Sequence, residues 1–369
     1  MKKISLLMLA AGLMLAAACT PKQQPTMRQA LEGKFVIGTA MNVPQIMGYD
    51  TVGNKIIAEQ FSAVVAENIM KSGELVREPG QYDFTMADKF VEFGEAHDMF
   101  ITGHTLVWHS QLPRWFTRDD EGNQVTREVL IERMRDHIHT VVGRYKGRIK
   151  GWDVINETFE DNGDLRYFSP FVRIIGEDFI PLAFQFAHEA DPDAELYYND
   201  YSMFLPGRRD AVVKMIRSLK EKGIRIDAVG MQAHYGMDYP EISEVEKSIQ
   251  AFIAEGVNVM ITEFDLSALP SAESQSANIS DTEEYQASLN PYVDGLPEDV
   301  SAAWNARMQD FFELFLKYQD NITRVTMWGL TDGESWKNGF PIRGRTDYPL
   351  LYDRNHQPKP VVEWIQNLK

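Results

Sequence analysis

The sequence repeats one pattern from about Phe35 to its end, in which a short apolar segment alternates with a longer segment that has apolar residues at helical spacing. In one clear example, a helical pattern stops at Gly147 and an apolar segment follows from Ile149 to Val154. Similar helical patterns stop at Gly223 and Gly256. Apolar strands that alternate with amphipathic helices predict a parallel sheet covered by helices.

The pattern predicts eight strands, at residues 35–39, 62–66, 101–105, 149–154, 195–198, 226–231, 257–261 and 325–328. Eight such units favour an α/β fold of the closed (β/α)8 TIM-barrel type, in one domain that spans residues 31–369. The alternative is an open doubly wound sheet. Neither a Gly-x-Gly-x-x-Gly turn after the first strand nor a Gly-Lys-Ser/Thr phosphate loop supports it.

One long stretch interrupts the pattern after the seventh strand. Residues Leu266 to Ser301 are rich in Ser, Ala, Glu and Asn, which is typical of a loop. Two interpretations stay open for this loop, a solvated surface segment or one edge of a binding cleft.

The first nineteen residues have the pattern of an export signal. Lys2 and Lys3 precede an apolar stretch from Ile4 to Ala18, which is too short for a permanent membrane-spanning helix. The stretch ends at Cys19, the only cysteine of the chain, so the mature protein has no internal disulfide.

Small residues directly before Cys19 resemble a bacterial lipoprotein signal, although Leu15 lies one place further from the cysteine than that pattern prefers. We therefore expect a lipidated Cys19, with ordinary cleavage nearby as the alternative. Residues 20–30 then form a short tether, and the protein is exported to the periplasm or the cell surface. Its contact with a membrane is expected only through the lipid, and we expect a monomer.

The charge balance excludes some partners. With 37 basic and 54 acidic side chains, the formal net charge is −17. Such a chain repels the phosphates of nucleic acids and is not attracted to anionic membranes. Binding of an uncharged polymer does not depend on this net charge.

Two apolar segments each deliver a glutamate at the carboxyl end of a predicted strand. The first is Trp152–Glu157 and the second is Ile261–Asp265, which contains Glu263. Holding an ionisable group where water is scarce is costly, and it indicates a function. Cleavage of a glycosidic bond requires two facing carboxyl groups, one that protonates the leaving oxygen and one that attacks or stabilises the sugar cation.

Polar and aromatic residues follow the other predicted strands as well. Carboxyl ends of barrel strands meet on one face, so these residues are expected to line one pocket. Amide, imidazole and carboxyl groups bind sugar hydroxyls, and indole rings stack on the C–H faces of sugars. The residues are Glu67, Asn68, His104, Trp108, Gln111, Asn156, Asn199, Asp200, Tyr201, Gln232, His234, Asp265, Trp328 and Trp336.

Each of these residues, taken singly, also has a structural interpretation, as an ion-pair partner or a core residue. The histidines also raise the question of a metal site. His137 and His139 lie two residues apart on a predicted helix, which points them in different directions. Zinc requires three or four converging ligands. We therefore expect no metal and no cofactor.

Six segments of the sequence, in this order and spacing, resemble glycoside hydrolase family 10 across essentially all of Phe35 to Lys369. They are Ala66–Asn68, Gly103–His109, Trp152–Glu157, Gly230–His234, Ile261–Asp265 and Trp328 to Trp336. The resemblance implies an endo-β-1,4-xylanase on a (β/α)8 barrel that hydrolyses xylan or xylo-oligosaccharides with retention of configuration and without a cofactor.

The resemblance also implies roles for individual residues. Glu157 corresponds to the general acid/base and Glu263 to the nucleophile. His234 and Asp265 correspond to the pair that supports the nucleophile, and Asn156 and Gln232 to residues that bind the sugar 2-hydroxyl. The non-reducing side corresponds to Glu67, Asn68, Lys71, His104, Trp108 and Gln111. Trp328 and Trp336 correspond to the cleft walls, and Tyr201 to a leaving-side platform.

One residue departs from the family pattern. Many members have Trp after the lysine that corresponds to Lys71, whereas this chain has Ser72. The departure affects the shape of the distal glycone site and leaves the catalytic pair untouched.

The implied mechanism makes a demand on Glu157, which must be neutral when the reaction starts. Its pKa must therefore lie above the free value of about 4.3. We expect apolar enclosure by Trp152 and repulsion from ionised Glu263 to raise it.

Three alternative functions can be compared with this prediction, and the first of them is the nearest rival. A retaining β-glycanase that cuts glucans would differ in the space around the sugar C6. A non-catalytic polysaccharide-binding protein tethered by Cys19 would not need both Glu157 and Glu263. A metal-dependent hydrolase would need ligands that the sequence does not present.

Overall fold

The computed structural model describes residues 24–271 and 284–368. The predicted export signal, Cys19 and the first part of the predicted tether lie outside the described residues. The same holds for residues 272–283 of the predicted long loop.

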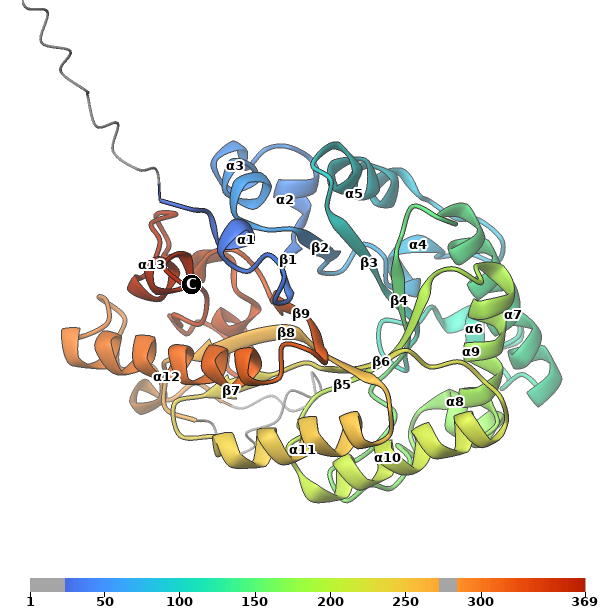
Figure 1. Ribbon diagram of the computed structural model, residues 1–369. Helices are drawn as coiled ribbons and strands as arrows, with labels where there is room; N and C mark the ends of the chain where they lie inside the picture. The colour runs from blue at the N-terminus through green and yellow to red at the C-terminus, as the bar shows by residue number, and fades with distance from the viewer. Residues whose placement is uncertain (1–23, 272–283, 369) are drawn as a thin grey trace, which may run out of the picture.

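Eight parallel strands close into a barrel, and the strand order in the sheet is β6-β5-β4-β3-β2-β1-β9-β8, with β6 also paired to β8. The prediction of a (β/α)8 barrel is confirmed. Figure 1 shows the strands around the centre of the molecule. The strands are β1 (Val36–Met41), β2 (Ala63–Ala66), β3 (Phe100–Val107), β4 (Gly151–Asn156), β5 (Glu195–Asp200), β6 (Ala228–Met231), β8 (Asn258–Ser267) and β9 (Ile322–Met327).

Helices surround the barrel and connect successive strands (Figure 1). Seven of them lie in the connections between barrel strands, namely α3 (Thr51–Gln60), α5 (Thr85–Ala96), α7 (Arg127–Arg144), α9 (Phe179–Ala190), α10 (Pro206–Glu221), α11 (Ile242–Ala254) and α12 (Glu298–Lys317). An eighth, α13 (Pro360–Gln366), follows β9 and contacts α1 (Met27–Ala30). Within residues 24–271 and 284–368, no helix combines the length and apolar character needed to cross a membrane.

Short helices lie in the connections between strands and after β9. They are α2 (Val43–Ile46), α4 (Ser72–Leu75), α6 (Arg114–Thr117), α8 (Pro170–Ile174), and the 3-10 helices η1 (Ala287–Leu289), η2 (Asp332–Glu334) and η3 (Trp336–Asn338).

The prediction for the long loop is wrong at both ends. Leu266 and Ser267 still belong to β8, and α12 already begins at Glu298. Polar residues at the end of β8 gave it the composition of a loop. Asp265 and Ser267 are nevertheless buried, by tertiary contacts that composition does not reveal.

A further short strand, β7 (His234–Gly236), was not predicted. It continues the path of β6 beyond a backbone kink at Ala233, where φ is +64°. Among the strands of the described residues it pairs with β8, and this pairing sets His234 opposite Asp265.

Local chemistry explains the boundaries of α7. The Thr126 hydroxyl caps its first turn by accepting a hydrogen bond from the Val129 N–H. Leu130, Met134 and Ile138 bury one face of α7, which is worth about 1.5–3 kcal/mol per fully buried side chain. Gly147 ends the region with a φ of +75°, a conformation that glycine adopts without steric cost.

The core between barrel and helices is aromatic on the side of α12. Phe264 of β8 lies 5.6 to 6.2 Å, between ring centroids, from three phenylalanines of α12, namely Phe311, Phe312 and Phe315. These contacts anchor β8 from outside. The neighbouring residues of β8, Glu263 and Asp265, belong to the polar cluster with His234.

Candidate active site

The two glutamates predicted from the strand ends are both buried at the carboxyl-end face of the barrel. Glu157 directly follows β4, and Glu263 lies within β8. Glu157 has a φ of +59°, in the left-handed region that non-glycine residues rarely adopt. Such strain persists where the surrounding structure over-determines it, typically at functional sites.

A chain of amide hydrogen bonds joins the two glutamates. The Asn199 Nδ2 donates to Glu263 Oε1 at 2.7 Å and to Asn156 Oδ1 at 2.9 Å. The Gln232 Nε2 donates to Asn156 Oδ1 at 3.3 Å and to Glu157 Oε1 at 3.0 Å. The structure therefore brings Glu157 and Glu263 into one site, as the sequence predicted.

Asn199 has a larger role than the sequence suggested. It stands opposite Asn156 in the register of β4 and β5, so its amide lies between the two halves of the site. The Thr262 hydroxyl donates to Asn199 Oδ1 at 2.6 Å, which fixes the orientation of that amide. Its place at the end of a predicted strand was the only sequence signal.

Three N–H donors surround the carboxyl group of Glu157. The Trp108 Nε1 donates to Oε2 at 2.8 Å, the Asn156 Nδ2 donates to Oε1 at 3.1 Å, and Gln232 donates to the same Oε1. Burial raises the pKa of Glu157, and the negative charge of Asp200 raises it further. The hydrogen bonds and the positive charge of Arg166 oppose this rise and do not cancel it. Glu157 is therefore biased toward the protonated form, as a proton donor requires.

The prediction gave burial and a nearby negative charge as the causes of this shift; it was right about burial but named other residues. The structure gives Asp200 as the main negative charge that acts on Glu157, in place of Glu263. Trp152 is buried against Gly103 of the neighbouring strand, and Trp108 is the tryptophan that contacts the carboxyl group. Both differences arise from cross-strand packing, which strand position alone does not reveal.

His234 holds Glu263 in the ionised form. The ring of His234 places Nε2 3.3 Å from Glu263 Oε2 and Nδ1 2.9 Å from Asp265 Oδ2. Burial alone would raise the pKa of Glu263, but His234, His104 and Lys71 outweigh it, and the net pKa is lowered. Burial likewise opposes protonation of His234, but Asp265 and Glu263 outweigh it and raise its pKa. The site thus pushes the pKa values of its two glutamates in opposite directions.

Two neighbours hold Asp265 in turn. The Trp336 Nε1 donates to Asp265 Oδ2 at 2.7 Å, and the Lys337 Nζ lies 3.8 Å from Oδ1. Despite complete burial, the positive charges of His234 and Lys337 keep the pKa of Asp265 low. Lys337 was not predicted as a site residue, and only its position next to Trp336 could have indicated it.

The residues after β2 form the other side of the site. The Lys71 Nζ donates to Asn68 Oδ1 at 2.8 Å and lies 5.0 Å from the centroid of the Trp108 ring. Burial lowers the pKa of Lys71, while Glu263, Glu67 and Glu157 act in the opposite sense. Lys71 therefore lies among three glutamates, and Glu67 and Asn68 belong to the same cluster as predicted.

His104 and Trp328 complete this wall. The His104 Nδ1 lies 2.9 Å from Asp153 Oδ2, which orients the imidazole ring. The edge of that ring meets Trp328 at 5.5 Å between centroids. Trp328 packs with Ala40 and Val65 of the adjacent strands, and Trp336 packs against this small cluster.

Gln111 is joined to the site differently from the other predicted residues. Its side chain is exposed, and its backbone carbonyl accepts a hydrogen bond from the Gly73 N–H at 2.8 Å. The contact fixes the segment after Lys71. Ser72, the departure from the family pattern, is buried with its Oγ 3.2 Å from His137 Nε2, so it faces helix α7.

The two helical histidines have different partners. His137 lies between Ser72 and the Tyr82 hydroxyl, and His139 lies 3.3 Å from Glu189. They point apart as the spacing predicted. In the described ranges, no cluster of three or more His, Cys, Asp or Glu side chains is arranged to hold a metal ion.

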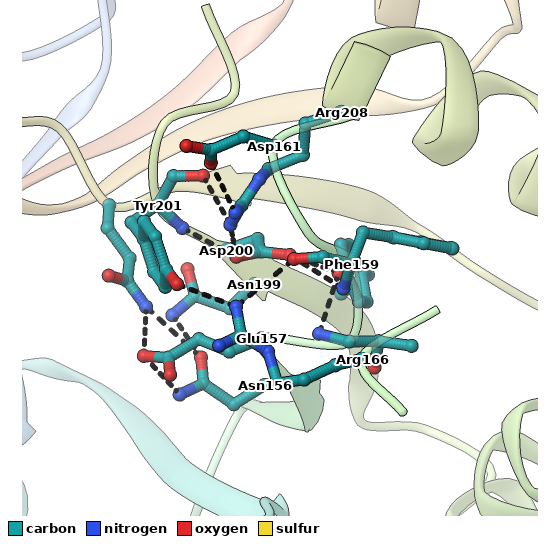
Figure 2. Close-up of polar contacts among 12 residues, drawn as sticks. Asn156, Glu157, Phe159, Asp161, Arg166, Asn199, Asp200, Tyr201 and Arg208 are labelled. Atoms are coloured by element: carbon teal, nitrogen blue, oxygen red, sulfur yellow. Dashed lines mark hydrogen bonds and ion pairs between the residues drawn. The ribbon is translucent and has the colours of Figure 1, made fainter. Parts of the chain in front are cut away.

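Tyr201, the predicted leaving-side platform, is packed against two buried arginines. It is only 4% exposed, and the guanidinium groups of Arg208 and Arg166 lie over its ring at 4.1 and 5.4 Å from the centroid. Its hydroxyl accepts a hydrogen bond from Arg166 Nη2 at 2.6 Å (Figure 2). The platform role of Tyr201 stays a prediction.

The same neighbours hold Asp200 behind Glu157. Arg208 donates to Asp200 and to Asp161 (Figure 2). The Tyr198 hydroxyl also donates to Asp200. Arg208 and Asp200 are both fully buried, so water does not stabilise their charges. Each charge is stabilised by its contact with the other.

A parallel (β/α)8 barrel with one carboxyl group biased toward protonation and a second biased toward ionisation is the arrangement of a barrel-type glycoside hydrolase. Comparison with known proteins gives the family. Residues 26–368 match the model of glycosyl hydrolase family 10. The chain belongs to glycosyl hydrolase family 10 and is therefore a glycoside hydrolase.

Several relatives match over most of their length. The chain is 53% identical to endo-1,4-beta-xylanase A of Xylanibacter ruminicola, over 97% of each chain. It is 38% identical to an endo-1,4-beta-xylanase of Geobacillus stearothermophilus, over 93% of this chain and 98% of the relative. A solved family 10 endoxylanase from a sugarcane soil metagenome has a TM-score of 0.90 and 44% identity, with 93% of this chain and all of that chain covered.

Proposed function

We propose that the protein is an endo-β-1,4-xylanase that hydrolyses internal bonds of xylan with retention of configuration. The observation that carries the mechanism is the opposite direction of the pKa shifts at Glu157 and Glu263 within one hydrogen-bonded site. The names of the relatives support the substrate. So does a structural neighbour at 32% identity and a TM-score of 0.82, a mutant solved in complex with xylotriose.

In the first step, ionised Glu263 attacks the anomeric carbon and the glycosidic C–O bond breaks. Glu157 gives its proton to the departing oxygen, so the leaving sugar departs as a neutral alcohol. The product is a glycosyl ester of Glu263. Asn199, which contacts the attacking carboxylate, holds its orientation during this step.

In the second step, Glu157 acts as a base. It takes a proton from water, the water oxygen bonds to the anomeric carbon, and the ester to Glu263 breaks. Forming the ester removes the charge of Glu263, so Glu157 can carry its own charge without repulsion from that carboxylate. Ionised Glu157 is then the base that takes the proton from the water.

Xylose differs from glucose by the absence of the C6 hydroxymethyl group, so a xylose site can be closed where a glucose site needs room. Trp336 supports a closed wall, because it is held by Asp265 and stacks on Phe340 at 4.7 Å between centroids. This rigid packing favours xylan over β-glucans as the substrate.

The test compares products from unbranched xylan, branched xylan and carboxymethyl cellulose under identical conditions. We expect xylo-oligosaccharides of mixed length from xylan and little release from carboxymethyl cellulose. Proton NMR during the first minutes should show the β-anomer of the new reducing end before mutarotation. Preferred release from carboxymethyl cellulose would favour a glucan-cutting enzyme, and an initial α-anomer would contradict retention.

We also propose that the protein is exported and anchored through a lipid on Cys19. The support is the sequence pattern of residues 1–19. Fractionation of cells that express the whole chain should place it with membranes, and Cys19→Ala should move it to the soluble fraction. Equal distribution of the two proteins would contradict the anchor.

A further inference from the structure

Two neighbouring aromatic side chains are exposed in the loop that starts at the catalytic acid/base. Tyr167 is 76% exposed and Phe168 is 40% exposed. They lie between Glu157 and helix α8, in the connection from β4 to the outer ring. Single exposed apolar residues are common, but two adjacent aromatic rings next to an active site are typical of a binding surface.

A rigid base supports these rings. Phe168 meets the edge of His109 at 5.3 Å, and Tyr167 meets the edge of Phe168 at 6.0 Å, between ring centroids. The guanidinium of Arg166 lies 5.3 Å from the Phe168 ring. Arg166 is itself fully buried and donates hydrogen bonds to the Tyr201 hydroxyl and the Phe159 carbonyl. The aromatic pair is therefore positioned before any ligand arrives.

Both supports lead directly to Glu157. His109 follows Trp108, whose indole donates to Glu157 Oε2. Arg166 contacts Phe159, two residues after Glu157, and its charge acts on the Glu157 carboxyl. The aromatic pair is thus linked to the proton donor through His109 and Trp108 and through Arg166.

Its place around the barrel indicates which part of the substrate it meets. The glycone candidates Glu67, Asn68 and Lys71 follow β2, whereas the Tyr167–Phe168 loop follows β4 and is braced by Tyr201 after β5. The strand order β2-β3-β4-β5 separates the two groups. Tyr201, the predicted leaving-side residue, thus lies on the same side as the Tyr167–Phe168 loop.

We infer that Tyr167 and Phe168 form a stacking surface for a neutral β-1,4-linked pyranose unit on the leaving-group side of the cleaved bond. The inference rests on the proposed xylanase function. A xylose ring offers C–H groups on its faces and carries no charge, which matches an exposed aromatic surface whose adjacent cation is already bonded within the protein.

The experiment uses the whole enzyme with Tyr167→Ala and Phe168→Ala combined. The substrates are xylohexaose, which extends over the leaving side, and an aryl β-xylobioside, whose leaving group is a single ring. We expect kcat/KM for xylohexaose to fall about fivefold, which corresponds to about 1 kcal/mol for a lost aromatic contact. The loss for the aryl xylobioside should stay below about twofold on the same argument.

A second readout is the position of cleavage in xylohexaose labelled at its reducing end. Without the stacking surface, fewer units are held on the leaving side, so cleavage should move toward the labelled end. Tyr167→Phe combined with Phe168→Tyr keeps both rings and should retain the wild-type ratio and cleavage positions. Because both side chains are exposed, we expect unchanged thermal unfolding in all variants.

If the wild type hydrolyses xylohexaose, two results would overturn the inference. One is an equal loss of kcat/KM on the two substrates, and the other is an unchanged ratio of the two kcat/KM values together with unchanged cleavage positions. A wild type that does not hydrolyse xylohexaose would overturn the proposed function, and this inference with it.

Discussion

The indole nitrogen of Trp108 donates a hydrogen bond to Oε2 of Glu157 at 2.8 Å. This bond stabilises the carboxylate form of a group that burial and Asp200 push toward protonation. The pKa of Glu157 is thus a balance between neighbours that act in opposite directions, and single substitutions should move it in a known direction.

Replacing Trp108 with Phe should raise the pKa of Glu157, because it removes a hydrogen bond that lowers this pKa. The alkaline limb of the kcat/KM profile, where Glu157 loses its proton, should move to higher pH. Trp115→Phe is the control, because that indole donates to the Val76 carbonyl instead. An alkaline limb that moves to lower pH would contradict the assignment of Glu157 as the acid.

Asp265→Asn should move the acid limb of the same profile to higher pH. Asp265 raises the pKa of His234, and the positive charge of His234 lowers the pKa of Glu263. Loss of the Asp265 charge therefore raises the pKa of Glu263, so the nucleophile becomes protonated at a higher pH than in the wild type. The exposed Asp83→Asn serves as control, and an unmoved acid limb in Asp265→Asn would argue against this coupling.

Glu263→Ala should lower hydrolysis of an aryl xyloside by about 10⁴-fold or more, as expected for loss of a nucleophile. Added azide fits the space of the lost carboxyl group and should restore turnover, with the inverted glycosyl azide as product. Absence of both rescue and azide product would count against Glu263 as the nucleophile.

Glu157→Ala should distinguish substrates by their leaving groups. General acid catalysis contributes about 10²–10⁴-fold when the leaving oxygen needs a proton, and little when the leaving group is an activated phenol. We therefore expect the larger loss in kcat/KM for xylo-oligosaccharides and the smaller loss for activated aryl xylosides. Equal losses of kcat/KM on the two substrate classes would contradict the role of Glu157 as the acid.

Arg208→Met should destabilise the protein by about 3–5 kcal/mol, because it leaves the buried Asp200 carboxylate without its charged partner. Arg217→Met is the matched control, since the Arg217 side chain is 63% exposed in its ion pair with Glu255. That change should cost much less, because water and salt screen an exposed ion pair. Urea denaturation gives the free energy of unfolding of each variant. An equal loss in the two variants would show that burial does not make the Arg208–Asp200 ion pair more important for stability than the exposed one.

Much of the barrel could be predicted from the sequence because each strand and helix carries its own pattern. The apolar face of α7, its cap at Thr126 and the stop at Gly147 are all local features. Where the prediction of Leu266–Ser301 was wrong, composition conflicted with tertiary burial. The polar end of β8 is a strand because β7 and the loop at Pro349 supply its hydrogen-bond partners.

The sequence by itself determined the barrel and the identity of its two glutamates, because strand periodicity places residues such as Glu157 and Glu263 at one face of a closed parallel sheet. Only the tertiary structure decided which charges act on them. Asp200 behind Glu157 and His234 beside Glu263 lie 43 and 29 positions away along the chain. Electrostatic interactions depend on separation in space and on burial, and folding alone sets both.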